Sequence, residues 1–127
     1  MATENFQFRL DPKSGVPVYR QLIDQILGAI TIGALKPSDR LPTVRQIAVD
    51  LAINPNTVVR AYKELEIRRV LATQQGIGTF VSNEQLKPDE VERQRRLTQL
   101  VADFIARAGA EGFTVSELDA ALQQLKQ

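Results

Sequence analysis

The sequence predicts a mainly α-helical fold with one small β-hairpin, followed by a short helical tail. Five stretches carry apolar residues at helical spacing, two predicted helix starts have capping boxes, and two β-prone runs flank a connection with two glycines. The chain has 127 residues, of which 43% are hydrophobic. That length suits one compact domain with a short appendage and leaves no room for a second full-sized domain.

The first predicted helix begins near Pro17, a residue favoured at first helical positions, and ends near Gly33. Its apolar residues recur at i, i+3, i+4, i+7, i+8 and i+11, which places them on one face. They are Tyr19, Leu22, Ile23, Ile26, Leu27 and Ile30. Ahead of this helix, residues 5–10 alternate apolar and polar, which predicts a short strand, and residues 11–15 predict a turn.

Two further helices are expected to meet at a tight corner. Thr43 and Gln46 form a capping box that opens a short helix ending near Ala52. Asn54 is expected to cap the next helix, with Pro55 in its first position. About three residues separate the two helices, which is the length of a helix-turn-helix corner.

The β-prone runs are residues 70–73 and 79–81, joined by residues 74–78. The Gly76-Ile77-Gly78 sequence admits a phosphate-loop interpretation, but no Lys-Ser/Thr follows it and no helix comes next, so a hairpin is favoured. Helix, short helix, corner, helix and hairpin is the order of a winged helix-turn-helix. We assign that fold to residues 1–83.

Residues 84–127 are expected to form a helical tail that makes a dimer. One helix is predicted from about residue 89 to 108, a break over residues 109–112, and a second helix opened by a capping box at Thr114 and Glu117. Two amphipathic helices cannot bury their apolar stripes alone, so they pack on a second subunit or fold back on the first domain. The residues predicted to dimerise are Leu97, Leu100, Val101, Phe104, Ile105, Leu118 and Leu122.

Composition excludes several kinds of chemistry. The chain has no Cys and no His, which excludes disulfides, thiolate chemistry and Ser/His or Cys/His catalytic pairs. A metal site would need carboxylates alone, so we expect no metal, no cofactor and no enzymatic activity. No apolar run approaches the ~20 residues of a membrane span, and the first ten residues lack an apolar core. We therefore expect a cytoplasmic protein without a membrane partner.

Charge is distributed unevenly along the chain. Residues 1–83 hold ten basic and seven acidic side chains, whereas residues 84–127 hold six and eight. A mildly basic front is compatible with DNA binding, although many ordinary domains show the same imbalance.

The third helix presents polar residues away from its apolar side. A B-DNA major groove is about 12 Å wide and accepts one α-helix, whose early residues reach the base edges. Asn56, Arg60 and Lys63 fall on this outward side, with Thr57 beside them. Asn can pair with adenine and Arg with guanine. For Thr57 and Lys63 two interpretations stay open: each contacts the DNA, or each is a surface residue of the helix without a DNA contact.

Two arginines and one asparagine near the corner also admit two interpretations. Arg45, in the first turn of the short helix, reaches phosphate or a base edge, or is a solvated charge. Arg60 contacts DNA, or pairs with Glu64 at i,i+4. Asn54 is a DNA contact or a cap alone.

Three segments together resemble the GntR family of bacterial repressors: residues 39–48, 53–66 and 76–81. The Asn-Pro-Asn-Thr-Val and Arg-Ala-Tyr-x-Glu-Leu-Glu sequences, and Pro-Val-Tyr-Arg-Gln-Leu at residues 17–22, look like the YtrA-type subfamily. The resemblance covers about residues 6–81. It implies that Arg45, Asn56 and Thr57 contact DNA, and that Gly76 of the wing tip, with Gln75 beside it, approaches a minor groove.

The sequence departs from the family pattern at three positions. The family often has Arg where this chain has Pro55 and Val59, and Gly where Arg69 stands. Arg60 is displaced by one position from Val59, about 100° on a helix, and the turn into the wing is expected to differ.

The resemblance also implies a short helical tail that makes the dimer. A twofold dimer matches an inverted-repeat operator, and binding there would repress the promoter. The DNA-binding residues predicted are Thr43, Arg45, Asn54, Asn56, Thr57, Arg60, Lys63, Gln75 and Gly76. The alternative is a winged-helix protein-interaction module without DNA function. Whether a small-molecule effector binds is left open.

Overall fold

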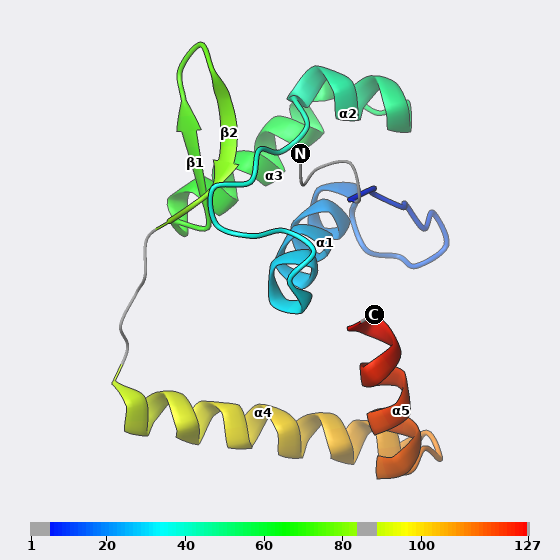
Figure 1. The fold of residues 1–127 in the computed structure, drawn as a ribbon. Coiled ribbons are helices and arrows are strands. Elements are labelled where there is room, and N and C mark those ends of the chain that lie inside the picture. Colours follow the sequence, from blue (N-terminus) through cyan, green and yellow to red (C-terminus); the bar gives the residue numbers. More distant parts are fainter. Residues whose placement is uncertain (1–5, 84–88, 127) are drawn as a thin grey trace. The chain divides into compact units, whose positions relative to one another are not determined.

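The computed structural model describes residues 6–83 and 89–126. Within these ranges the chain forms five helices and one two-stranded antiparallel sheet (Figure 1). Contacts divide the chain into two compact units, Met1–Glu84 and Gln85–Gln127. The expected fold, mainly helical with one small hairpin, is confirmed.

The first unit contains α1 (Val18–Ile32), α2 (Val44–Leu51), α3 (Pro55–Ile67), β1 (Leu71–Gln74) and β2 (Gly78–Val81). Pro17 lies one position earlier than expected, because it is the N-cap of α1 rather than its first helical residue. Gly33 ends α1 in the left-handed conformation, with φ of 85°, as a glycine at this position readily does.

One hydrophobic core holds the first unit together, and α1 and α3 contribute most of it because these two helices pack against each other. The buried positions recur at helical spacing, which is why the apolar stripes predicted the helices. The fully or nearly fully buried core residues are Leu22, Ile23, Ile26, Leu35, Leu41, Ile47, Val58, Ala61, Tyr62, Leu65 and Leu71.

The strand predicted for residues 5–10 is wrong over its described part, because residues 6–10 form no strand. The alternation itself is present, with the three apolar side chains of this segment half-buried and the two polar ones exposed. Gln25 donates from Nε2 to the carbonyl oxygen of Arg9 at 2.7 Å and accepts from its N–H at 2.9 Å. Gln21 forms the same pair of bonds with Asp11, at 3.0 and 2.8 Å. Two side-chain amides of α1 therefore replace a neighbouring strand.

The hairpin is attached to the segment before α2. β1 and β2 pair with Leu71 opposite Val81 and Gln74 opposite Gly78. The N–H of Val81 donates to the carbonyl oxygen of Asp39 at 2.8 Å, and the N–H of Leu41 donates to that of Thr79 at 2.8 Å. Residues 38–41 therefore run along β2 and fix the wing to the entry of α2.

The second unit consists of α4 (Glu90–Ala110) and α5 (Val115–Leu125). The break expected at residues 109–112 is too early, because α4 continues to Ala110 and the chain turns at Gly112, whose φ is 91°. The capping box at the start of α5 is confirmed: Thr114 accepts from the backbone N–H of Glu117, whose carboxylate accepts from that of Thr114. Residues 84–88 lie outside the described part of the chain.

Candidate nucleic-acid interface

Two caps fix the corner between α2 and α3. Thr43 Oγ1 accepts from the N–H of Gln46 at 3.0 Å, and Gln46 Oε1 accepts from the N–H of Thr43 at 2.9 Å, which confirms the first capping box. Asn54 Oδ1 accepts from the N–H of Asn56 at 2.8 Å. The side-chain oxygens of Thr43 and Asn54 therefore accept from helix N–H groups. Only the hydroxyl proton of Thr43 and the amide NH₂ of Asn54 are left to donate to another partner.

Tyr62 sets the position of α3 relative to α2. Its hydroxyl donates to the carbonyl oxygen of Pro42, just before the α2 N-cap, at 2.6 Å. The side chain is 3% exposed, and burial raises the pKa of this phenol well above its usual value. The hydroxyl is therefore neutral at physiological pH and holds the two helices of the corner together.

The outward side of α3 carries polar residues. Asn56, Arg60 and Lys63 are exposed, Thr57 is half-buried, and the opposite side of the helix lies in the core. This exposed strip is flanked by two other elements. On the α1 side, Arg60 Cζ lies 3.7 Å from the ring centroid of Tyr19.

On the hairpin side of α3, Thr73 Oγ1 of β1 donates to Glu66 Oε1 at 2.7 Å. The alternative for Arg60, a pair with Glu64, is not formed: Glu64 pairs with Arg68 at 3.3 Å, and Arg60 stacks on Tyr19.

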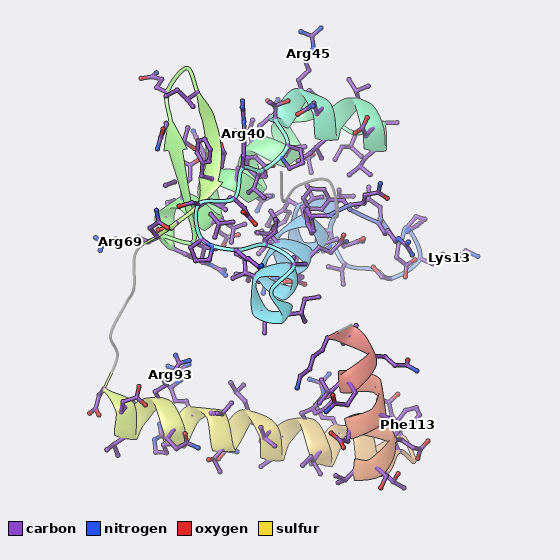
Figure 2. The ribbon with its side chains drawn as sticks, viewed as in Figure 1. Lys13, Arg40, Arg45, Arg69, Arg93 and Phe113 are labelled. Carbon is purple, nitrogen blue, oxygen red and sulfur yellow. The ribbon has the colours of Figure 1, made fainter. Side chains whose placement is uncertain are left out.

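Arg45 projects from the first turn of α2. It is exposed, and Figure 2 shows its side chain pointing away from α2, toward the side of the unit on which the hairpin tip lies. Gln75 and Gly76 form that tip and are exposed, with Gly76 in the left-handed conformation at φ of 80°. The structure therefore brings α2, α3 and the hairpin tip to one end of the unit (Figure 1).

Arg40, in the segment before α2, bonds to the hairpin connection. Its Nη2 donates to the carbonyl oxygen of Ile77 at 2.7 Å. A Cβ on Gly78 would lie 2.9 Å from Arg40 Nε, so the side chain passes closely over the second glycine of the connection. Sequence reasoning assigned no role to Arg40, because its partner lies 37 residues away in the chain.

Comparison with known proteins identifies the family. A family model described as "Bacterial regulatory proteins, gntR family" matches residues 18–81. The chain is 41% identical over 100 residues to the HTH-type transcriptional repressor YtrA of Bacillus subtilis, an alignment that covers 75% of this chain and 76% of that protein. This chain belongs to the gntR family.

Solved structures of gntR-family proteins agree with this assignment. YtrA of Sulfolobus acidocaldarius superposes with a TM-score of 0.59 at 32% identity, covering 81% of this chain and 97% of that one. The DNA-binding domain of AraR, solved in complex with operator ORX1, superposes with a TM-score of 0.51 at 28% identity, covering 61% of this chain and 92% of that one. This gntR chain is accordingly a winged-helix transcriptional regulator of the YtrA type and not an enzyme.

The turn from α3 into the wing contains a residue in the left-handed conformation. Arg69 stands where the family tends to have Gly, yet its φ is 62°, in the left-handed region. The N–H of Val70 donates to the carbonyl oxygen of Leu65 at 2.9 Å and closes the turn. An arginine in this conformation carries backbone strain that a glycine would avoid.

The residues predicted to dimerise lie on the second unit of this gntR protein and are not buried within it. Phe104 is 50% exposed and Leu100 is 64% exposed, and Ala108 is the one buried residue among the described positions of α4 and α5. The others are Leu97, Val101, Ile105 and Leu122, which are exposed, and Leu118, which is half-buried.

No group of three or more Asp, Glu, His or Cys side chains within residues 6–83 and 89–126 could hold a metal ion. No helix in the same ranges combines the length and apolar character that crossing a bilayer requires.

Proposed function

We propose that this chain is a sequence-specific repressor that acts as a homodimer on an inverted-repeat operator. The observation that carries the proposal is the exposed polar strip of α3, which is flanked by α1 and the hairpin and shares one end of the unit with Arg45. A single helix of this kind fits a major groove while the wing reaches the neighbouring minor groove. The AraR domain, of similar fold, was solved with operator DNA.

The residues of the strip take different parts in this proposal. Asn56 and Arg60 read base edges, because their side chains can form two hydrogen bonds with adenine and guanine respectively. Arg45 and Lys63 bind phosphate, which positions the protein without reading sequence. Thr43, Asn54 and Thr57 supply further polar contacts around the corner, and Gln75 and Gly76 reach the minor groove from the wing tip.

The second unit supports dimerisation through its uncovered apolar stripe. Polar side chains of α4 form hydrogen bonds with one another. Arg95 donates to both carboxylate oxygens of Glu92, at 2.7 and 3.0 Å, and Gln99 donates to Asp103 at 2.9 Å. Among the described residues of the unit, the large apolar side chains of α4 stay exposed. Pairing of two stripes about a twofold axis would remove them from water and place two copies of α3 in related orientations.

Selection from a random duplex pool with the purified full chain tests this function. The expected result is an inverted repeat whose half-sites lie about one helical turn, or a multiple of it, apart. The affinity for the selected operator should fall steeply with salt because phosphate contacts release counterions. Recovery of unrelated sequences, or equal affinity for selected and scrambled duplexes at low salt, would remove the proposal.

Arg45→Ala tests the interface at one residue. Loss of its charge-assisted contact should weaken operator binding about tenfold in a fluorescence anisotropy titration, and leave dimerisation intact. Lys13→Ala is the matched control, because Lys13 is also exposed but lies in the turn before α1 (Figure 2). Equal operator affinity in wild type and Arg45→Ala would remove Arg45 from the interface.

A further inference from the structure

Arg60 rests on an aromatic ring that belongs to another helix. The ring of Tyr19, in the first turn of α1, lies 3.7 Å below the guanidinium carbon of Arg60 on α3. Tyr19 is half-buried and packs against the core with its apolar part, whereas Arg60 is exposed. The two residues line one surface depression together with Asn56, Val59, Lys63, Glu64 and Ile67. Tyr19 therefore borders the same strip that carries the candidate DNA contacts.

Stacking on a ring restricts an arginine in a way that suits base recognition. The ring face attracts the flat guanidinium cation. The N–H groups at the edge of the guanidinium are not used in this contact and can donate to other acceptors. A free arginine side chain must lose much rotamer entropy when it binds two acceptors in one plane. An arginine already held on a ring loses less of it on binding.

We propose that Tyr19 is a positioning residue for sequence recognition, which holds the guanidinium of Arg60 in place for a guanine edge in the major groove. This inference rests on the proposed function. It makes α1 part of the DNA interface, although Tyr19 itself contacts no base. The aromatic ring, and not the hydroxyl, is the part of Tyr19 that does this, because the ring face is what Arg60 contacts.

The expected effect is modest and specific. An exposed cation–π contact corresponds to about a two- to fivefold change in affinity. The loss should appear as weaker discrimination at the one base pair of each half-site that Arg60 reads. A general loss of packing would instead weaken binding to all duplexes alike.

A double-mutant cycle tests the coupling between the two residues. Tyr19→Leu keeps an apolar side chain of helical preference but removes the ring, and Tyr19→Phe keeps the ring. Operator affinity is measured for both, in the wild-type and the Arg60→Ala background, by fluorescence anisotropy. We expect Tyr19→Leu to weaken binding about two- to fivefold in the wild type and not at all in the Arg60→Ala background, with Tyr19→Phe close to wild type.

Several results would overturn the proposal. If Tyr19→Leu weakens binding equally in both backgrounds, Tyr19 does not act through Arg60. If Tyr19→Leu strengthens binding, the ring holds Arg60 away from the DNA. Thermal unfolding monitors the fold, and Tyr19→Met takes the place of Tyr19→Leu in the cycle should the leucine variant unfold. A wild-type chain that selects no operator rejects the proposed function, whereas a selected operator without coupling rejects the role of Tyr19 alone.

Discussion

In the first unit most large apolar side chains of α1 and α3 are buried or half-buried, whereas in the second unit nearly all those of α4 and α5 are exposed. Leu22, Ile26 and Leu65 are 0% exposed, while Leu100 and Phe104 are at least half exposed. Both units have helices with well-formed caps, so local sequence signals do not account for the difference. What differs is the packing partner, which the first unit contains within itself and the second does not.

This contrast has a consequence for how each unit is stabilised. The first unit should unfold with a midpoint that does not depend on protein concentration. The second should depend on a second copy of the chain, because helices of this kind obtain most of their stability from tertiary packing.

Phe104→Asp should break the dimer. The change places a carboxylate at the centre of the apolar stripe of α4, where burial against a partner would desolvate it. We expect the dimer dissociation constant to rise by about three orders of magnitude, roughly 4 kcal/mol, in sedimentation equilibrium. Ala106→Asp is the matched control, because Ala106 is exposed on the opposite side of the same helix and receives the same charge. A dimer that withstands Phe104→Asp would place the interface elsewhere.

Leu65→Ala should destabilise the first unit without affecting dimerisation. Leu65 is fully buried, so the truncation leaves a cavity in the core and costs about 3 kcal/mol. For a unit of this size the thermal midpoint should fall by about 15 °C. The shift is expected to be the same at low and high protein concentration. A shift that grows on dilution would mean that the core of the first unit depends on the dimer.

The sequence predicted the parts of the fold that depend on neighbours a few residues away. Helix faces follow from spacings of three and four residues, and the caps at Thr43, Asn54 and Thr114 bond to residues two or three positions ahead. The strand error at residues 6–10 has the opposite origin. The alternation of half-buried and exposed side chains is present, but the backbone of Arg9 bonds to the side-chain amide of Gln25, 16 residues further along the chain, and not to a strand.

The candidate site was predictable to the same extent. The outward side of α3 follows from the helical period, so the exposure of Asn56, Arg60 and Lys63 was available from the sequence alone. The contacts that orient these side chains were not. Arg60 meets Tyr19 only because α1 packs on α3, and Arg40 reaches the hairpin only because residues 38–41 run along β2.

Tyr62→Phe tests whether the corner depends on a single buried hydroxyl. Removal of the bond to the Pro42 carbonyl should lower the free energy of unfolding by about 1 kcal/mol at neutral pH. Burial raises the pKa of Tyr62 in the folded state, so its contribution is present below the unfolded pKa of about 10 and is lost as pH rises further. Urea titrations from pH 7 to 11 should show a steeper alkaline decline for the wild type. Equal slopes for the two proteins would contradict this account.

Ala52→Gly should give the smallest change, and it should stabilise the first unit. Ala52 ends α2 at φ of 54°, a left-handed conformation that costs a residue with a Cβ about 1–2 kcal/mol. Glycine avoids this strain but loses about 0.4–1 kcal/mol more through the entropy of the unfolded chain. Because the alanine side chain is exposed, little packing is lost, and a net gain of about 0.5 kcal/mol follows.

The opposite exchange in α1 supplies the control for Ala52→Gly. Gly28 lies inside the helix, is exposed and has no atom within 4 Å of the position that a Cβ would take. Gly28→Ala should therefore stabilise the first unit by about 0.5–1 kcal/mol through helix propensity. Urea unfolding should show both variants gaining stability, with the dimer dissociation constant unchanged in each. If Ala52→Gly loses stability while Gly28→Ala gains it, the alanine side chain stabilises the end of α2, and the predicted gain from relieving backbone strain is wrong.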